Sequence, residues 1–243
     1  MSSEMVAGEV AETRWQDLYR IGGIASFVGV ALVIFAIVAF FIWPYQPGYT
    51  STAEIFATLQ ENLWSGLAAL DLLFILGTLL STLPMLALYA SLKRVNESYA
   101  LIALALGLIG IVSLIPARPI AEMVQLSNQY AAATTDAVRS QYLAAGDALL
   151  ALFNGTAWLV NIVLVSVSSL ISCLLMLRSH AFNKATAIVG IASNAAALCF
   201  FIPVVGIPLL FVATIGAVAF QFLVGLALNR LAREAALSGG TTA

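Results

Sequence analysis

The chain of 243 residues carries very little charge. Asp, Glu, Lys and Arg make up 9% of it, against about a quarter in soluble domains. Apolar residues make up 62%, and the mean hydropathy is +1.02. The apolar residues stand in long unbroken runs, which membrane insertion explains better than a very large soluble core. Composition therefore predicts an integral membrane protein.

Residues that bind metals or cofactors are scarce. His180 is the single histidine, so no pair of imidazoles is available to ligate a haem or a metal within the membrane. Cys173 and Cys199 are the two cysteines, and both fall inside apolar runs, which argues against a disulfide framework. No His-Glu-x-x-His motif and no paired intramembrane aspartates occur. We therefore expect no cofactor, and these absences disfavour an intramembrane enzyme.

Features of nucleotide or nucleic-acid binding are also missing. The net charge is −2, so no overall basic field favours a nucleic acid. No segment has a clear strand pattern, and no Gly-rich phosphate loop follows one. Nucleic acid is therefore not an expected partner, and the secondary structure is expected to be all-α.

Six segments are long and apolar enough to cross a bilayer, which takes about 20 residues. Between Lys184 and Arg230 lie 45 uncharged residues, which as one helix would extend about 68 Å. That exceeds twice the ~30 Å hydrocarbon thickness, and the prolines and glycine at 203–208 divide the run into two helices. The predicted spans are about 21–43, 65–90, 99–117, 152–177, 185–202 and 209–229.

The basic residues predict the orientation. With six spans, eight of the ten share one side of the membrane, and only Arg118 and Arg139 lie on the other. Basic residues concentrate on the cytoplasmic side. We therefore expect a cell-membrane protein with a cytoplasmic N-terminal segment (1–20) and a cytoplasmic tail (230–243). The eight residues are Arg14, Arg20, Lys93, Arg94, Arg178, Lys184, Arg230 and Arg233.

Two of the predicted outer segments are long. Residues 44–62, with Pro44 and Pro47, are expected to form a loop. Residues 117–148 have a partial apolar stripe and helix-start signals, with Pro119 suited to a first helical turn. The resulting fold is a six-transmembrane-helix bundle with a short interfacial helical hairpin between spans three and four. An ordinary interfacial connector is the alternative for that segment.

Asp71 is the only ionisable residue inside an otherwise apolar predicted span. Such residues usually face the interior of the bundle. Counting helical rise from the cytoplasmic boundary places Arg118 at a similar height, so the two could pair. A hydrated interfacial carboxylate or a purely architectural ion pair would explain the same pattern. The predicted outward-facing polar pocket comprises Asp71, Arg118, Glu122, Asn154 and Asn161.

The layout resembles a family of uncharacterised prokaryotic six-span membrane proteins, a domain-of-unknown-function family. The resemblance rests on Arg20-Ile21-Gly22-Gly23-Ile24 and Leu70-Asp71-Leu72-Leu73. It also rests on an outer segment that runs from Gln129-Tyr130-Ala131-Ala132-Ala133 to Ala148-Leu149-Leu150-Ala151-Leu152. It implies the six-span topology, and it implies no activity and no catalytic residues.

Two functions fit these features better than an intramembrane enzyme does. The first is a protein that binds or moves a small or lipid-like molecule through the outward-facing polar pocket. The second is a structural or partner-binding subunit whose spans pack against another membrane protein. The expected partners are therefore membrane lipid, a small-molecule or lipid ligand, and a membrane-protein partner.

Overall fold

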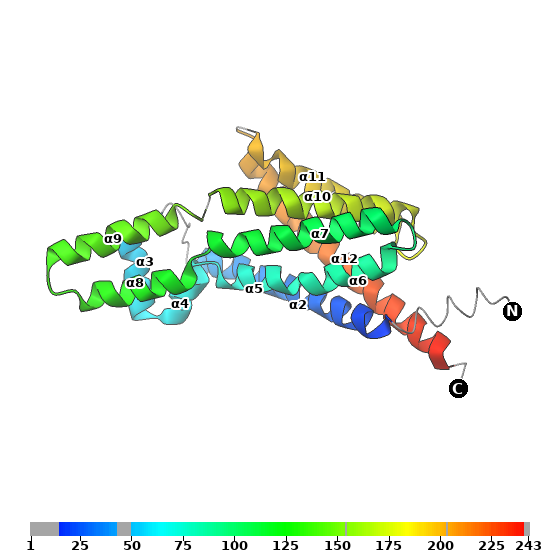
Figure 1. Cartoon of the computed structure of the whole chain (residues 1–243), viewed down its shortest axis with the longest axis horizontal. Helices are drawn as coiled ribbons and strands as arrows, with labels where there is room; N and C mark the ends of the chain where they lie inside the picture. The colour runs from blue at the N-terminus through cyan, green and yellow to red at the C-terminus, as the bar shows by residue number, and fades with distance from the viewer. Residues whose placement is uncertain (1–14, 43–49, 154, 203, 241–243) are drawn as a thin grey trace. The chain divides into compact units, whose positions relative to one another are not determined.

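The computed structural model describes residues 15–42, 50–153, 155–202 and 204–240, and all regular structure within these ranges is helical (Figure 1). Six of the helical segments are long and apolar enough to cross a membrane. The prediction of an all-helical chain with six spans is therefore confirmed, and the protein is a multi-pass membrane protein.

The spans are formed by α2 (Gln16–Ile42), α5 (Leu72–Leu80) with α6 (Thr82–Leu92), α7 (Glu97–Leu114), α10 (Thr156–Arg178), α11 (Lys184–Leu198) with the 3-10 turn η2 (Cys199–Phe201), and α12 (Gly206–Gly240). The remaining helices are α3 (Thr52–Glu61), α4 (Leu63–Ala69), the 3-10 turn η1 (Ile115–Ala117), α8 (Ile120–Ala132) and α9 (Asp136–Leu150). Helix α12 thus continues beyond residue 229, the predicted end of the last span.

The chain divides into two compact units. Unit 1 takes in residues 1–31, 78–109 and 162–243, and unit 2 takes in residues 32–77 and 110–161. The core of unit 1 joins apolar side chains of α2, α6, α10 and α12, among them Tyr19, Leu92, Met176 and Leu228. Because these side chains come from distant parts of the sequence, their shared core holds the separate segments of unit 1 together.

Helices α7 and α10 are joined by polar side chains in both units. In unit 1, Ser168 Oγ donates to the carbonyl oxygen of Ala103 at 2.6 Å. In unit 2, Asn161 Nδ2 donates to the carbonyl oxygen of Gly110 at 2.8 Å. Such interhelical bonds contribute on average about 0.6 kcal/mol in membrane proteins. These two polar residues of the fourth span therefore serve helix packing.

The long uncharged run after Lys184 is divided as predicted. Helix α11 and η2 end at Phe201, and α12 begins at Gly206. The turn is tight: a Cβ atom on Gly206 would lie 2.1 Å from the carbonyl oxygen of Phe200. Only glycine permits this approach, so Gly206 fixes where the turn can form.

The second span departs from its prediction. In place of one helix over 65–90, the chain forms α4, α5 and α6, with breaks at residues 70–71 and at Ser81. The second break lies three residues before Pro84. Proline has no backbone N–H to donate one helical turn back, and its ring crowds the preceding turn. Asp71 therefore lies at the start of the membrane-crossing segment Leu72–Leu92 and not inside an unbroken span.

Unit 2 contains a three-helix group formed by α3, α8 and α9, which we call the helical cap. Helices α8 and α9 form the predicted hairpin, shown in green in Figure 1. Apolar side chains from all three helices meet in one core with Leu70 and Phe153, including Phe56, Met123 and Leu150. Polar bonds close the group: Gln60 Nε2 donates to Ser127 Oγ at 3.0 Å, and Thr52 Oγ1 donates to Asp147.

The expected loop over residues 44–62 is wrong in its second half, because residues 52–61 form α3. A reciprocal capping box starts this helix. The Glu54 N–H donates to Ser51 Oγ at 3.3 Å, and the Ser51 N–H donates to Glu54 Oε2 at 3.2 Å. These bonds satisfy two backbone donors that a helix start leaves unpaired. The first part of the expected loop, residues 44–49, lies outside the described residues.

Candidate functional site

Asp71 occupies a kink between two helices. Helix α4 ends at Ala69, and Asp71 adopts a left-handed backbone conformation with a φ of 63° before α5 begins. Its N–H donates to the Ala68 carbonyl oxygen at 3.1 Å, and its own carbonyl oxygen accepts from Ile75 at 3.0 Å. Aspartate tolerates this conformation better than most residues, but it still carries a backbone cost. The kink separates α4 from α5, so the Asp71 carboxylate does not belong to the face of either helix.

Arg118 is positioned by the end of the third span. Pro116 lies within η1, and the Arg118 N–H donates to the Ile115 carbonyl oxygen at 3.1 Å. Pro119 follows directly, and a residue before proline is pushed away from the helical conformation. Arg118 therefore leaves the helix with a φ of −132° and a ψ of 74°.

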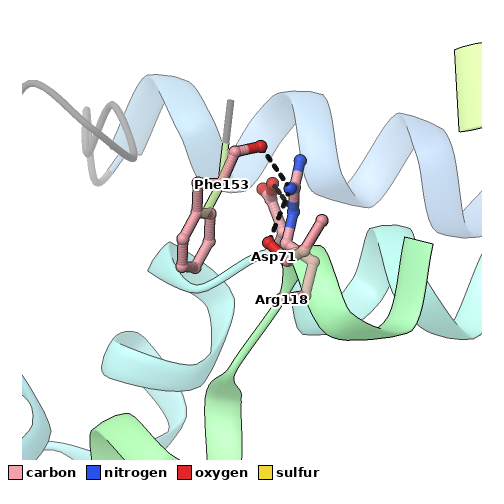
Figure 2. Close-up of polar contacts among 4 residues, drawn as sticks. Asp71, Arg118 and Phe153 are labelled. Carbon is pink, nitrogen blue, oxygen red and sulfur yellow. Dashed lines mark hydrogen bonds and ion pairs between the residues drawn. The ribbon is translucent and has the colours of Figure 1, made fainter. Parts of the chain in front are cut away.

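The two charged residues form an ion pair within unit 2. Arg118 Nε donates to Asp71 Oδ2 at 2.9 Å. Arg118 Nη1 donates to two backbone carbonyl oxygens, that of Ala117 at 3.0 Å and that of Phe153 at 2.7 Å. Figure 2 shows the guanidinium between the Asp71 carboxylate and the Phe153 carbonyl group. The predicted pairing of Asp71 with Arg118 is present.

The two partners differ in exposure. The Arg118 side chain is 5% exposed, whereas the Asp71 side chain is 35% exposed. Aromatic rings cover the guanidinium: the centroid of Phe153 lies 4.9 Å from Arg118 Cζ, and that of Phe74 lies 5.9 Å away. Excluding water on this side strengthens each charge-assisted bond and makes an unpaired guanidinium costly. The cation is thus enclosed, while part of the carboxylate stays accessible.

Of the other predicted pocket residues, Asn161 and Glu122 make no observed contact with this pair. Asn161 is buried and donates its side-chain amide to Gly110, as described above. Glu122 is exposed in the first turn of α8, and Asn154 lies outside the described residues. A wider polar pocket around the pair therefore stays a prediction.

Sequence reasoning missed the groups that complete the guanidinium's surroundings. Phe153 contributes its backbone carbonyl and its ring, and Phe74 contributes its ring. A backbone carbonyl carries no residue-type signal. Aromatic rings near an arginine do carry one, because they are favoured neighbours of a guanidinium. The position of Phe74 one helical turn after Asp71 could have suggested it.

The chemistry available at the pair depends on its two charged groups. Within the described ranges, no three His, Cys, Asp or Glu side chains gather closely enough to hold a metal ion. The arrangement offers one accessible carboxylate beside one enclosed cation. Such a pair can accept hydrogen bonds from a ligand or can hold two chain segments together.

Comparisons with known proteins give no relative. No protein-family model, no curated protein and no solved structure matches the chain.

Proposed function

We propose that the protein lies in the cell membrane with both termini in the cytoplasm, and that it binds or moves a small or lipid-like molecule at the Asp71–Arg118 pair. The uneven distribution of basic residues between the two predicted sides supports the orientation. In this orientation the helical cap and the ion pair belong to the outer side.

One observation carries the binding function: the Asp71 carboxylate is held out of the helix by a left-handed kink, is 35% exposed, and lies against an enclosed guanidinium. Backbone conformations with a conformational cost persist where surrounding structure fixes them, and they concentrate at ligand sites. Among the described residues, Arg118 bonds Oδ2, and no protein donor bonds Oδ1. Oδ1 can therefore accept a hydrogen bond from a hydroxyl or amine group of a ligand.

The test is to identify what the protein retains when it is extracted from native membranes in mild detergent. Native mass spectrometry would compare the wild type with the neutral pair variant Asp71→Asn/Arg118→Gln. We expect a retained species that the variant loses although it still unfolds in one cooperative transition, which shows that it remains folded. The matched control is Asp136→Asn, because Asp136 is an exposed carboxylate in the first turn of α9. Equal retention by all three proteins would contradict the proposal.

The extent of the binding site can be tested separately. Glu122→Gln and Asn154→Ala change two predicted pocket residues without touching the ion pair. If these residues line the pocket, each variant lowers retention of the same species while stability is unchanged. Asn161 is less suitable for this purpose, because its amide already bonds the Gly110 carbonyl group and its loss would weaken helix packing.

A specific observation also favours the alternative function, a partner-binding subunit. The helical cap has its own apolar core, and its exposed ionisable residues are mostly acidic. An acidic surface of this kind complements a basic partner surface. Recovery of the protein in a stable hetero-complex from mild detergent, abolished by charge reversal on the cap, would support this function over ligand binding. The acidic residues are Glu54, Glu61, Glu122, Asp136 and Asp147, against one base, Arg139.

A further inference from the structure

Unit 1 contains a cleft of about 660 Å³ that plays no part in the site described above. It lies between the turn after α6, the turn after α10 and the last turns of α12. Its volume falls in the range of small-molecule sites. The polar side chains that line it include Arg94, Arg178, Ser179, His180 and Glu234.

Basic residues outnumber acidic ones among the described residues that line the cleft. Arg94 and Arg178 both line it, and Glu234 is the one acidic residue among its lining residues. Glu234 is already paired with Arg230, whose Nε lies 3.5 Å from Glu234 Oε1. Among the residues that the structure describes, no carboxylate pairs with Arg178, so its guanidinium can bind a ligand. An anionic group with several acceptor oxygens is the complementary ligand.

An apolar groove of about 300 Å³ shares a wall with the cleft. Its lining is Tyr99 of α7, Ile171, Leu174 and Leu175 of α10, and Arg178. Arg178 thus lines both spaces, as the last residue of α10. Leu174 and Tyr99 are exposed on membrane-spanning helices, where the surroundings are hydrocarbon or its boundary. The protein therefore presents a basic polar cleft and an apolar groove that meet at one arginine.

We propose that this pair of spaces binds one anionic phospholipid, with its phosphate head group in the cleft and an acyl chain in the groove. Arginine recognises phosphate oxygens through paired N–H donors, and Arg178 can reach the cleft while its aliphatic stem covers the groove. Ser179 and His180 supply further polar groups for a head group. A soluble anion would use the cleft but would have no use for an adjoining groove on a membrane-facing helix. This site is independent of the function proposed for Asp71 and Arg118.

The experiment uses the full-length protein in a mild detergent with equal amounts of dioleoyl phosphatidylglycerol and dioleoyl phosphatidylcholine. Native mass spectrometry measures the bound fraction of each lipid. We expect the wild type to prefer phosphatidylglycerol, and Arg178→Gln to weaken its binding about fivefold, the effect of one basic residue near an anionic lipid. Lys184→Gln is the matched control, because Lys184 starts α11 and lines neither the cleft nor the groove. It should bind as the wild type does.

The groove is tested by Leu174→Trp, which fills it without changing charge. This exposed position should tolerate the substitution, and Ile188→Trp on α11 is the control at another exposed position. We expect Leu174→Trp to weaken phosphatidylglycerol binding and Ile188→Trp to leave it unchanged. Equal binding of the two lipids by the wild type would overturn the proposal. Displacement by millimolar inorganic phosphate, with no effect of Leu174→Trp, would overturn it in favour of a soluble anion.

Discussion

Arg118 Nε lies 2.9 Å from Asp71 Oδ2, and this bond joins residues 47 positions apart in the chain. The same guanidinium also bonds the carbonyl group of Phe153, 35 residues further on. One side chain thereby fixes the start of α5, the end of the third span and the segment that leads into α10. Removing it should loosen three segments of unit 2 at once.

The first prediction concerns the coupling of this pair. Asp71→Asn leaves an enclosed guanidinium without its carboxylate, which costs 3–5 kcal/mol in fully buried pairs. We expect a smaller loss, about 2–3 kcal/mol, because the Asp71 side chain is 35% exposed. The double variant Asp71→Asn/Arg118→Gln should recover part of that loss. Thermal unfolding in detergent across the four proteins measures the coupling, and strictly additive losses would show that the pair contributes nothing.

The second prediction concerns orientation. In a background without Cys173 and Cys199, cysteines introduced at Ser51 and Thr135 should react with an impermeant thiol reagent added to intact cells. Both positions are exposed. A cysteine introduced at Arg233 should react only after the membrane is permeabilised. Labelling of Arg233→Cys in intact cells together with protection of Thr135→Cys would reverse the proposed orientation.

The third prediction concerns the start of α3. Ser51→Ala removes the side-chain acceptor of the capping box and should destabilise α3 by about 1 kcal/mol. Hydrogen exchange of the backbone amides of residues 52–61 should accelerate about fivefold, the same energy expressed as an equilibrium constant. Ser51→Thr keeps the acceptor oxygen and is the matched control. Unchanged exchange in Ser51→Ala would mean that packing against α8 and α9 alone holds the helix.

The fourth prediction compares two glycines. Gly206→Ala places a methyl group 2.1 Å from the Phe200 carbonyl oxygen, so the turn before α12 must shift and the protein should lose stability. Gly77→Ala in α5 meets nothing closer than Leu32 Cβ at 3.8 Å. It should be neutral or stabilising by up to about 1 kcal/mol, because alanine favours a helix over glycine. The melting temperature should therefore fall for Gly206→Ala and stay unchanged or rise for Gly77→Ala. Equal losses would show that the turn is not restricted at Gly206.

The six spans could be predicted because hydrophobic length and charge placement are one-dimensional properties. Asp71 and Arg118 could be matched because helical rise converts residue number into height. The left-handed kink at Asp71 could not be predicted, because no glycine or proline marks it and tertiary contacts in unit 2 stabilise it. The bond to the Phe153 carbonyl oxygen could not be predicted for a related reason, because backbone acceptors occur at every residue.

The error at α3 has a different origin. A loop is indicated by Pro44, Pro47 and Gly48, but these residues carry no information about residues 52–61, which form α3. Ser51 followed by Glu54 is the sequence pattern of a capping box. Ile55, Phe56 and Leu59 then follow at helical spacing, and all three are buried. The break at Ser81 could likewise have been predicted from Pro84. No such residue marks the break at residues 70–71.

The helices of the cap lie far apart along the chain, and this has a consequence for biosynthesis. Its first helix is made about 60 residues before α8, which at 5–20 residues per second is a delay of about 3–12 s. During that interval the ribosome synthesises the second and third spans. Ile55, Phe56 and Leu59 stay uncovered meanwhile, because α8 and α9 have not yet been made. A chaperone that shields short apolar helices would act in this window. Nascent chains stalled before residue 120 should therefore be the ones most exposed to quality-control proteases.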